Sequence, residues 1–187
     1  ARALGLSVAE KKDSQDICFV EEGRYAEFLE TYTGKPLLPG NFTDSEGRIL
    51  GCHDGMARYT VGQRKGVRVA FGRPLYVLEK NAETQDVVMG ENDQLFRNAL
   101  LAGNCCIQEP YRRYFCEEEQ EFTGTVRHRY GQKDTPARIA KAADEEGFSS
   151  CLQVYFDLPQ RAVTPGQTVV FYDGDTVAGG GEIIRAL

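Results

Sequence analysis

Tryptophan is absent from the 187-residue sequence, and histidine and methionine occur only twice each. Six cysteines are present, but no two are spaced as C-x-x-C, so a zinc site of the usual spacing is not expected. No apolar run approaches about 18 residues, which excludes a membrane-spanning helix, and no signal peptide is visible. What remains is a chain that folds around ordinary hydrophobic cores, which its 41% hydrophobic residues can supply.

The six cysteines are scattered rather than forming the dense framework of a disulfide-stabilised domain. We therefore expect a protein of the reducing cytoplasm. The first residue is Ala1 rather than methionine, and residues 1–23 have no core of their own. We interpret the chain as an excised later part of a longer protein, with these residues as the tail of a preceding domain.

Acidic residues outnumber basic ones by 28 to 22, which gives a net charge of −6. The distribution of charge matters more for nucleic-acid binding than this sum. Residues 55–78, the first basic run, contain five basic and no acidic residues; residues 122–133, the second basic run, contain three basic and no acidic residues. Such segregation permits a basic face on an acidic protein, although two solvated strand faces are the plainer alternative.

One helix is predicted near the amino terminus, over residues 24–33. Tyr25, Phe28, Leu29 and Tyr32 recur at the spacing of one helical face, which we expect to pack into a core. Gly34 supplies the stop signal at its carboxyl end.

After this helix the sequence predicts short strands between turn residues. A hairpin is expected with strands at 41–43 and 48–50, followed by strands at 74–80 and 86–89. Four glycines between residues 51 and 66 indicate turns with positive φ or close approach of the backbone.

A second all-β unit is predicted after about residue 95. Six strands at this spacing suggest a closed barrel, which leaves no exposed edge. Residues 109–119 are expected to form a mobile loop. The predicted fold is mainly β: a tail with one short helix (1–33), a small glycine-rich β domain (34–94) and a six-stranded β-barrel (95–187). The barrel strands are expected at 99–107, 120–130, 137–143, 151–157, 168–172 and 180–184.

Cys18 is one candidate for chemistry because it lies between a polar run and an apolar flank. A partly exposed cysteine near lysines favours the thiolate, which is the nucleophilic form. Free cysteine is also among the residues most often buried, so spacing alone favours a structural role.

Residues 127–130 (Arg-His-Arg-Tyr) combine cations with an aromatic ring. Arginine pairs with phosphate, and a ring can stack on an unpaired base. The alternative is an ordinary strand with exposed polar side chains. Gln167 follows Pro165 and Gly166, and it can equally be a plain turn residue.

Three blocks of the sequence resemble the tRNA-specific 2-thiouridylase family, in the same order and over nearly the whole chain. They are KKDSQDICFV (11–20), GCHDGMARYTVGQRKGV (51–67) and TPGQTVVFYDGDTVAGGGEII (164–184). The resemblance implies that Cys18 carries a persulfide and that the chain is the carboxy-terminal part of the enzyme. It also implies that Arg129, Tyr130 and Gln167 contact tRNA.

The reaction that this resemblance implies is replacement of the C2 oxygen of the wobble uridine by sulfur. ATP adenylates the oxygen, and a cysteine persulfide then delivers sulfur. The implied partners are tRNA and a persulfide sulfur-donor protein, with no membrane and no DNA. ATP with Mg is implied for the full-length enzyme only, because the family's SGGxDS loop is missing from this chain. The chain alone is therefore expected to hold no cofactor and to be inactive. The alternative is a non-catalytic β-barrel RNA-binding module in which Cys18 is incidental.

Overall fold

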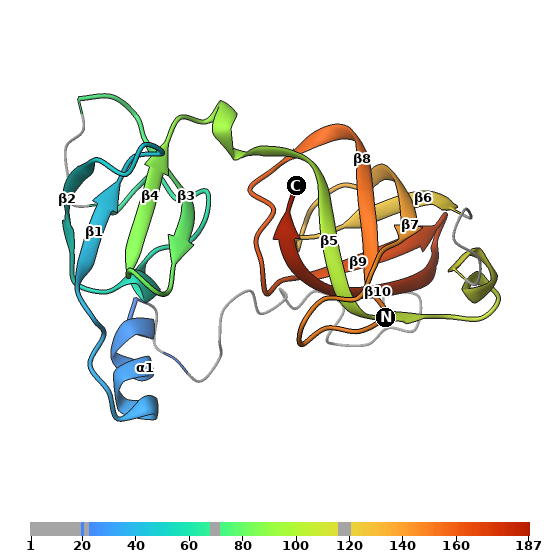
Figure 1. The fold of residues 1–187 in the computed structure, drawn as a ribbon, viewed down its shortest axis with the longest axis horizontal. Helices are drawn as coiled ribbons and strands as arrows, with labels where there is room; N and C mark the ends of the chain where they lie inside the picture. The colour runs from blue at the N-terminus through green and yellow to red at the C-terminus, as the bar shows by residue number, and fades with distance from the viewer. Residues whose placement is uncertain (1–19, 21–22, 68–71, 116–120) are drawn as a thin grey trace, which may run out of the picture.

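The computed structural model describes residue 20 and residues 23–67, 72–115 and 121–187. These residues form one α-helix, a four-stranded sheet and a closed six-stranded barrel. Figure 1 shows the sheet and the barrel side by side, joined through the short 3₁₀ helix η4 (Asp93–Leu95). The predicted mainly β fold, with its small β unit, its barrel and its single helix, is confirmed.

The small sheet has the strand order β2-β1-β4-β3. Its strands are β1 (Gly40–Thr43), β2 (Ile49–His53), β3 (Tyr76–Asn81) and β4 (Asp86–Gly90). The predicted hairpin joins β1 to β2, and its turn is closed by Asp44, whose Oδ1 accepts the backbone N–H groups of Glu46 and Arg48. The parallel pairing of β1 with β4 was not predicted, because nothing local signals it.

The barrel closes in the order β10-β5-β8-β7-β6-β9, with every pair of neighbouring strands antiparallel. Fully buried side chains such as Leu100, Ile139 and Phe171 fill its interior. Full closure pairs both edges of the sheet. The strands are β5 (Phe96–Ile107), β6 (Glu121–Arg127), β7 (Thr135–Lys141), β8 (Leu152–Arg161), β9 (Thr168–Asp173) and β10 (Thr176–Ala186).

The glycine triplet of β10 lies where neighbouring backbones come closest. A Cβ on Gly179 would lie 2.6 Å from the carbonyl oxygen of Cys106, and one on Gly180 would lie 2.7 Å from that of Val169. Real Cβ atoms are not found at such distances from backbone, so only glycine fits. The triplet thus serves close packing in the barrel.

The helix α1 (Tyr25–Thr33) forms as predicted and ends at Gly34, whose φ is 67°. Its aromatic face, however, is not in a core: Tyr25 is 44% exposed and Tyr32 is 79% exposed. Phe28 stacks on Tyr32 at 5.7 Å between ring centroids, and only Ala26 of the helix is buried. The prediction of core packing is wrong because spacing identifies an apolar face but not what covers it. None of the described helices is long and apolar enough to cross a membrane.

The predicted mobile loop at 109–119 contains the 3₁₀ helix η5 (Tyr111–Phe115). The rings of Tyr111 and Tyr114 pack on Phe122 of β6, at 5.5 and 5.6 Å between centroids. Residues 111–115 are therefore held against the barrel by aromatic contacts, which the sequence did not predict, and residues 116–119 lie outside the described residues.

Candidate nucleic-acid interface

The loop between β6 and β7, residues 128–134, presents the centre of the second basic run. Its tip is a tight turn in which the Gln132 N–H donates to the Arg129 carbonyl at 3.3 Å. Gly131 has a φ of 69°, the positive value that a type II turn requires at that position. Tyr130, between these residues, is 68% exposed. The turn therefore holds an aromatic ring out toward solvent.

The base of this loop is fixed by an ion pair. The guanidinium of Arg127 donates to both carboxylate oxygens of Asp134, at 2.5 and 3.0 Å. The hydrogen bond to Arg127 lowers the pKa of Asp134 and correspondingly raises that of Arg127. Arg127 also lies over the ring of Tyr172, 4.9 Å from its centroid. Arg127, one of the three cations of the second basic run, therefore has a structural role.

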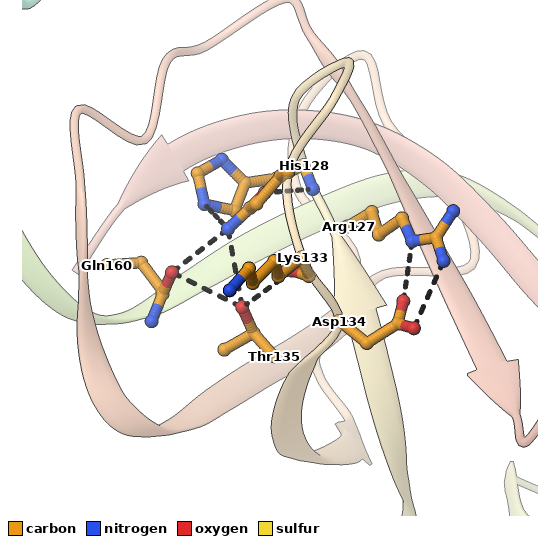
Figure 2. Close-up of polar contacts among 7 residues, drawn as sticks. Arg127, His128, Lys133, Asp134, Thr135 and Gln160 are labelled. Carbon is orange, nitrogen blue, oxygen red and sulfur yellow. Dashed lines mark hydrogen bonds and ion pairs between the residues drawn. The ribbon is translucent and has the colours of Figure 1, made fainter.

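Gln132 ties the loop to the barrel, as Figure 2 shows for the residues around it. Its Oε1 accepts the backbone N–H of His128 at 3.0 Å, which fixes the orientation of the amide. Its Nε2 then lies 3.1 Å from His128 Nε2 and donates to Gln160 Oε1 of β8 at 2.9 Å. Thr135 lies within 3.3 Å of both amides. This polar network makes the loop a rigid platform.

His128 is the buried centre of that network, with only 2% of its surface exposed. Burial, together with the charge of Arg129, lowers the pKa of His128, so the ring is neutral near pH 7. A neutral ring that accepts the Gln132 amide proton at Nε2 carries its own proton on Nδ1, which has no hydrogen-bond partner among the described residues. His128 therefore has a structural role, because its backbone N–H and its ring both contact the Gln132 side chain of the loop.

Arg129 reaches from this loop to the segment that follows β8. Its guanidinium donates to the Ala162 carbonyl at 3.1 Å, and the Thr164 hydroxyl donates to the same oxygen at 3.0 Å. Ala162 has a φ of 54°, a left-handed conformation that costs about 1–2 kcal/mol for a residue with a Cβ. Its N–H bonds to the Leu95 carbonyl at 2.8 Å. The bend at Ala162 is thus held by contacts on both sides of its backbone.

Gln167 lies at the same end of the barrel. Arg127 pairs with Val170, so residues 128–130 and 167–169 leave that rung in the same direction. The Gln167 N–H donates to the Thr164 carbonyl at 3.3 Å, which makes it part of the turn that begins at Thr164. Its Oε1 is buried without a hydrogen-bond partner in the described structure. The fold therefore gathers Arg129, Tyr130 and Gln167 at one end of the barrel.

Arg161 joins this end of the barrel to the small sheet. Its Nε donates to Asn92 Oδ1 at 3.1 Å, one terminal nitrogen donates to the Gly62 carbonyl at 3.3 Å, and its guanidinium lies 5.3 Å from the centroid of the Tyr76 ring. Beside it, Val61, Leu95 and Ala162 form a small buried cluster. Sequence reasoning did not single out Arg161, because its partners lie far away in the chain.

The first basic run meets the second at this junction. Thr60 N–H donates to Gln63 Oε1 at 2.9 Å, and Gln63 Nε2 donates to the Lys65 carbonyl at 2.9 Å. These bonds fix the turn in which Arg64 and Lys65 are exposed. The turn follows Gly62, which contacts Arg161, while Arg129 contacts the next residue, Ala162. Two segments without carboxylates are thereby brought together around residues 161–162.

Cys18 lies outside the described residues. Four cysteines within them, Cys52, Cys105, Cys106 and Cys151, are free thiols. Burial raises the pKa of Cys105 to about 12, so its thiolate is scarce at neutral pH. His53 accepts the Gly55 N–H at 3.2 Å within its own turn. Among the residues that the structure describes, no group of His, Cys, Asp and Glu side chains could hold a metal ion.

Comparison with known proteins gives two family models along the chain. Residues 26–91 match a tRNA methyl transferase PRC-barrel domain, and residues 105–183 match an aminomethyltransferase beta-barrel domain. The chain is 46% identical to the tRNA-specific 2-thiouridylase MnmA of Lachnoclostridium phytofermentans, over 99% of this chain and 49% of the relative. It is 44% identical to that of Acetivibrio thermocellus, over 98% of the chain and 48% of the relative, and 37% identical to that of Clostridioides difficile, over 100% and 49%. The chain thus spans about half the length of these curated relatives.

Proposed function

We propose, from the premise that this chain belongs to the tRNA-specific 2-thiouridylase family, that it is the carboxy-terminal part of a tRNA-uridine 2-sulfurtransferase. In this proposal residues 1–33 carry the persulfide cysteine, and residues 34–94 and 95–187 are two tRNA-binding domains. The observation that supports it most is the meeting of the two basic runs at the junction of the sheet and the barrel.

The exposed groups at the junction suit single-stranded RNA. Tyr130 offers a ring on which an unpaired base can stack, and Arg64 and Lys65 offer charge to the phosphate backbone. Arg129 is held in place by the Ala162 carbonyl and retains further N–H groups for phosphate or base. Gln167 would add a polar contact from the neighbouring turn. Rigid loops reduce the entropy lost when RNA binds.

Cys18 is the proposed sulfur carrier. Its thiolate would attack a donor protein's persulfide and take the outer sulfur, releasing the donor's thiolate. The terminal sulfur would then attack C2 of the adenylated wobble uridine and expel AMP. A second cysteine, from the part of the relatives that this chain does not cover, would attack the Cys18 sulfur, so that a disulfide forms and the transferred sulfur stays on C2. Activation by ATP with Mg is assigned to the part of the relatives that this chain does not cover, because the SGGxDS loop is missing here. The proposed compartment is the reducing cytoplasm, in which a free thiol persists.

Arg129→Ala in the 187-residue chain is expected to weaken tRNA binding about tenfold and to lower the slope of log affinity against log salt by about 1. The reason is the loss of one cation at the centre of the interface. Arg138→Ala is the matched control, since Arg138 pairs with Glu121 at 2.7 Å on the outer surface of β6 and β7. Its tRNA affinity should stay within about twofold of wild type. Fluorescence anisotropy over a salt series measures both quantities.

An unchanged affinity and salt slope for Arg129→Ala would contradict the proposed interface. Binding that is strongly salt-dependent but indifferent to the anticodon would instead support a non-catalytic RNA-binding module, since phosphate contacts carry no sequence information.

The 187-residue chain alone is expected to make no thiolated tRNA when supplied with ATP, a sulfide source and tRNA. Retardation of the tRNA on a mercury-containing gel reports the product. A retarded band above the background without protein would show that the chain contains an activating site of its own.

A further inference from the structure

A cavity of about 450 Å³ lies between the small sheet and the barrel. Its walls include Val61 and Leu78 from the sheet side and Leu95 and Val163 from the barrel side. The segment Ala162–Pro165 forms part of the same wall. That segment is the one whose Ala162 carbonyl accepts the Arg129 guanidinium, so the cavity adjoins the proposed RNA-binding surface.

Three cations line the cavity against one carboxylate, that of Glu79. Arg97 donates to the Gln94 and Phe96 carbonyls at 2.7 and 3.0 Å, and Arg185 pairs with Glu145 at 2.6 Å. The Lys80 ammonium, on an exposed residue of β3, has no hydrogen-bond or ion-pair partner among the described residues, and desolvation beside the cavity lowers its pKa. The cavity therefore combines apolar walls with an ammonium group that lacks a partner.

We propose that this junction cavity receives an unpaired nucleotide of the bound tRNA, with Lys80 contacting its phosphate. The inference rests on the proposed function, and it specifies the site on the protein that an unpaired base of the bound tRNA would occupy. The volume lies in the range of small-molecule sites, about 300–1,000 Å³. Aliphatic walls are suited to the faces of a base, and a lysine is a common phosphate ligand. A nucleotide here would contact both β units at once, so bound RNA would hold their relative orientation.

Lys80→Glu in the 187-residue chain tests the phosphate contact. We expect its affinity for an unmodified tRNA transcript to fall about tenfold, because an ammonium is replaced by a carboxylate beside a phosphate. Lys35→Glu makes the same charge change at an exposed position after α1, outside the cavity, and should change the affinity less than twofold. Equal losses for the two variants would overturn the inference, since they would reflect net charge alone.

Ala186→Phe tests occupancy without changing charge. Ala186 lines the cavity at the end of β10, so a phenyl ring there fills space that the nucleotide needs. Circular dichroism and the melting temperature establish that the variant is folded. Ala186→Ser, which adds one small atom, is the matched control. We expect at least a fivefold loss of tRNA affinity for Ala186→Phe and none for Ala186→Ser; equal affinity for the folded pair would contradict the inference.

Photocrosslinking with 4-thiouridine-substituted tRNA locates the base. We expect wild-type crosslinks in peptides containing residues 76–81 or 162–165, and their loss in Ala186→Phe. Crosslinks confined to other peptides would overturn the cavity site. If Arg129→Ala weakens tRNA binding while Lys80→Glu does not, the cavity inference fails and the proposed function stands; if neither variant weakens binding, both fail.

Discussion

Replacement of Cys18 by serine in the full-length protein is expected to lower tRNA thiolation by roughly 10³-fold or more, the scale on which a lost covalent nucleophile acts. A serine oxygen cannot carry a transferable sulfur atom, so the chemical step loses its donor. The affinity for tRNA should stay within about twofold of wild type, because the binding surface is assigned to residues of the sheet and the barrel. Mercury-gel retardation measures thiolation, and anisotropy measures affinity.

Cys52→Ser is the control for this experiment. Cys52 is an exposed free thiol on β2, and its contact is with the Asn41 side chain at 3.8 Å. Thiolation by this variant should match the wild type. Undiminished thiolation by Cys18→Ser would return Cys18 to a structural role and make the RNA-binding module the better description of the chain.

Replacement of Arg161 by alanine is expected to weaken tRNA binding about tenfold or more. Arg161 is not assigned a contact with RNA, so this effect would act through the junction. The side chain makes two hydrogen bonds and a ring contact across the junction, and each such contact contributes about 0.5–1.5 kcal/mol. Without these contacts the two basic runs are no longer held together in the free protein. Ordering them on binding then costs free energy, which lowers the affinity for tRNA. Affinity for tRNA and small-angle X-ray scattering of the free chain report the two effects.

Arg161→Lys is the informative comparison because it keeps the charge but loses the planar fork. It should behave like alanine if the junction geometry matters, and like wild type if charge alone matters. Arg138→Ala, outside the junction, should leave both the scattering profile and the affinity unchanged. Normal affinity and normal scattering for Arg161→Ala would show that Arg161 does not set the arrangement of the two units.

The sequence predicted the elements of the fold because their signals are local. The helix that ends at Gly34 and the six barrel strands follow from side-chain periodicity and turn residues. The parallel pairing of β1 with β4 and the exposure of Tyr32 depend on tertiary packing between elements. No local sequence pattern indicates such packing.

The candidate site was predictable only in part, for a similar reason. The family resemblance predicts tRNA contacts for Arg129, Tyr130 and Gln167, while their placement at one end of the barrel follows from strand register. The contact from Arg161 to Gly62 joins residues 99 positions apart, and the left-handed Ala162 is held by tertiary hydrogen bonds. Such features arise from the assembled structure, so an isolated sequence does not display them.

The most direct test measures thiolation and tRNA affinity together for the full-length wild type, Cys18→Ser and Arg129→Ala. The predicted result is a separation of roles: Cys18→Ser binds tRNA normally but makes no product, whereas Arg129→Ala binds weakly and recovers thiolation at saturating tRNA. Thiolation of tRNA by Cys18→Ser, or wild-type affinity of Arg129→Ala for tRNA, would contradict the proposal that this chain carries the sulfur on Cys18 and binds tRNA through its two β units.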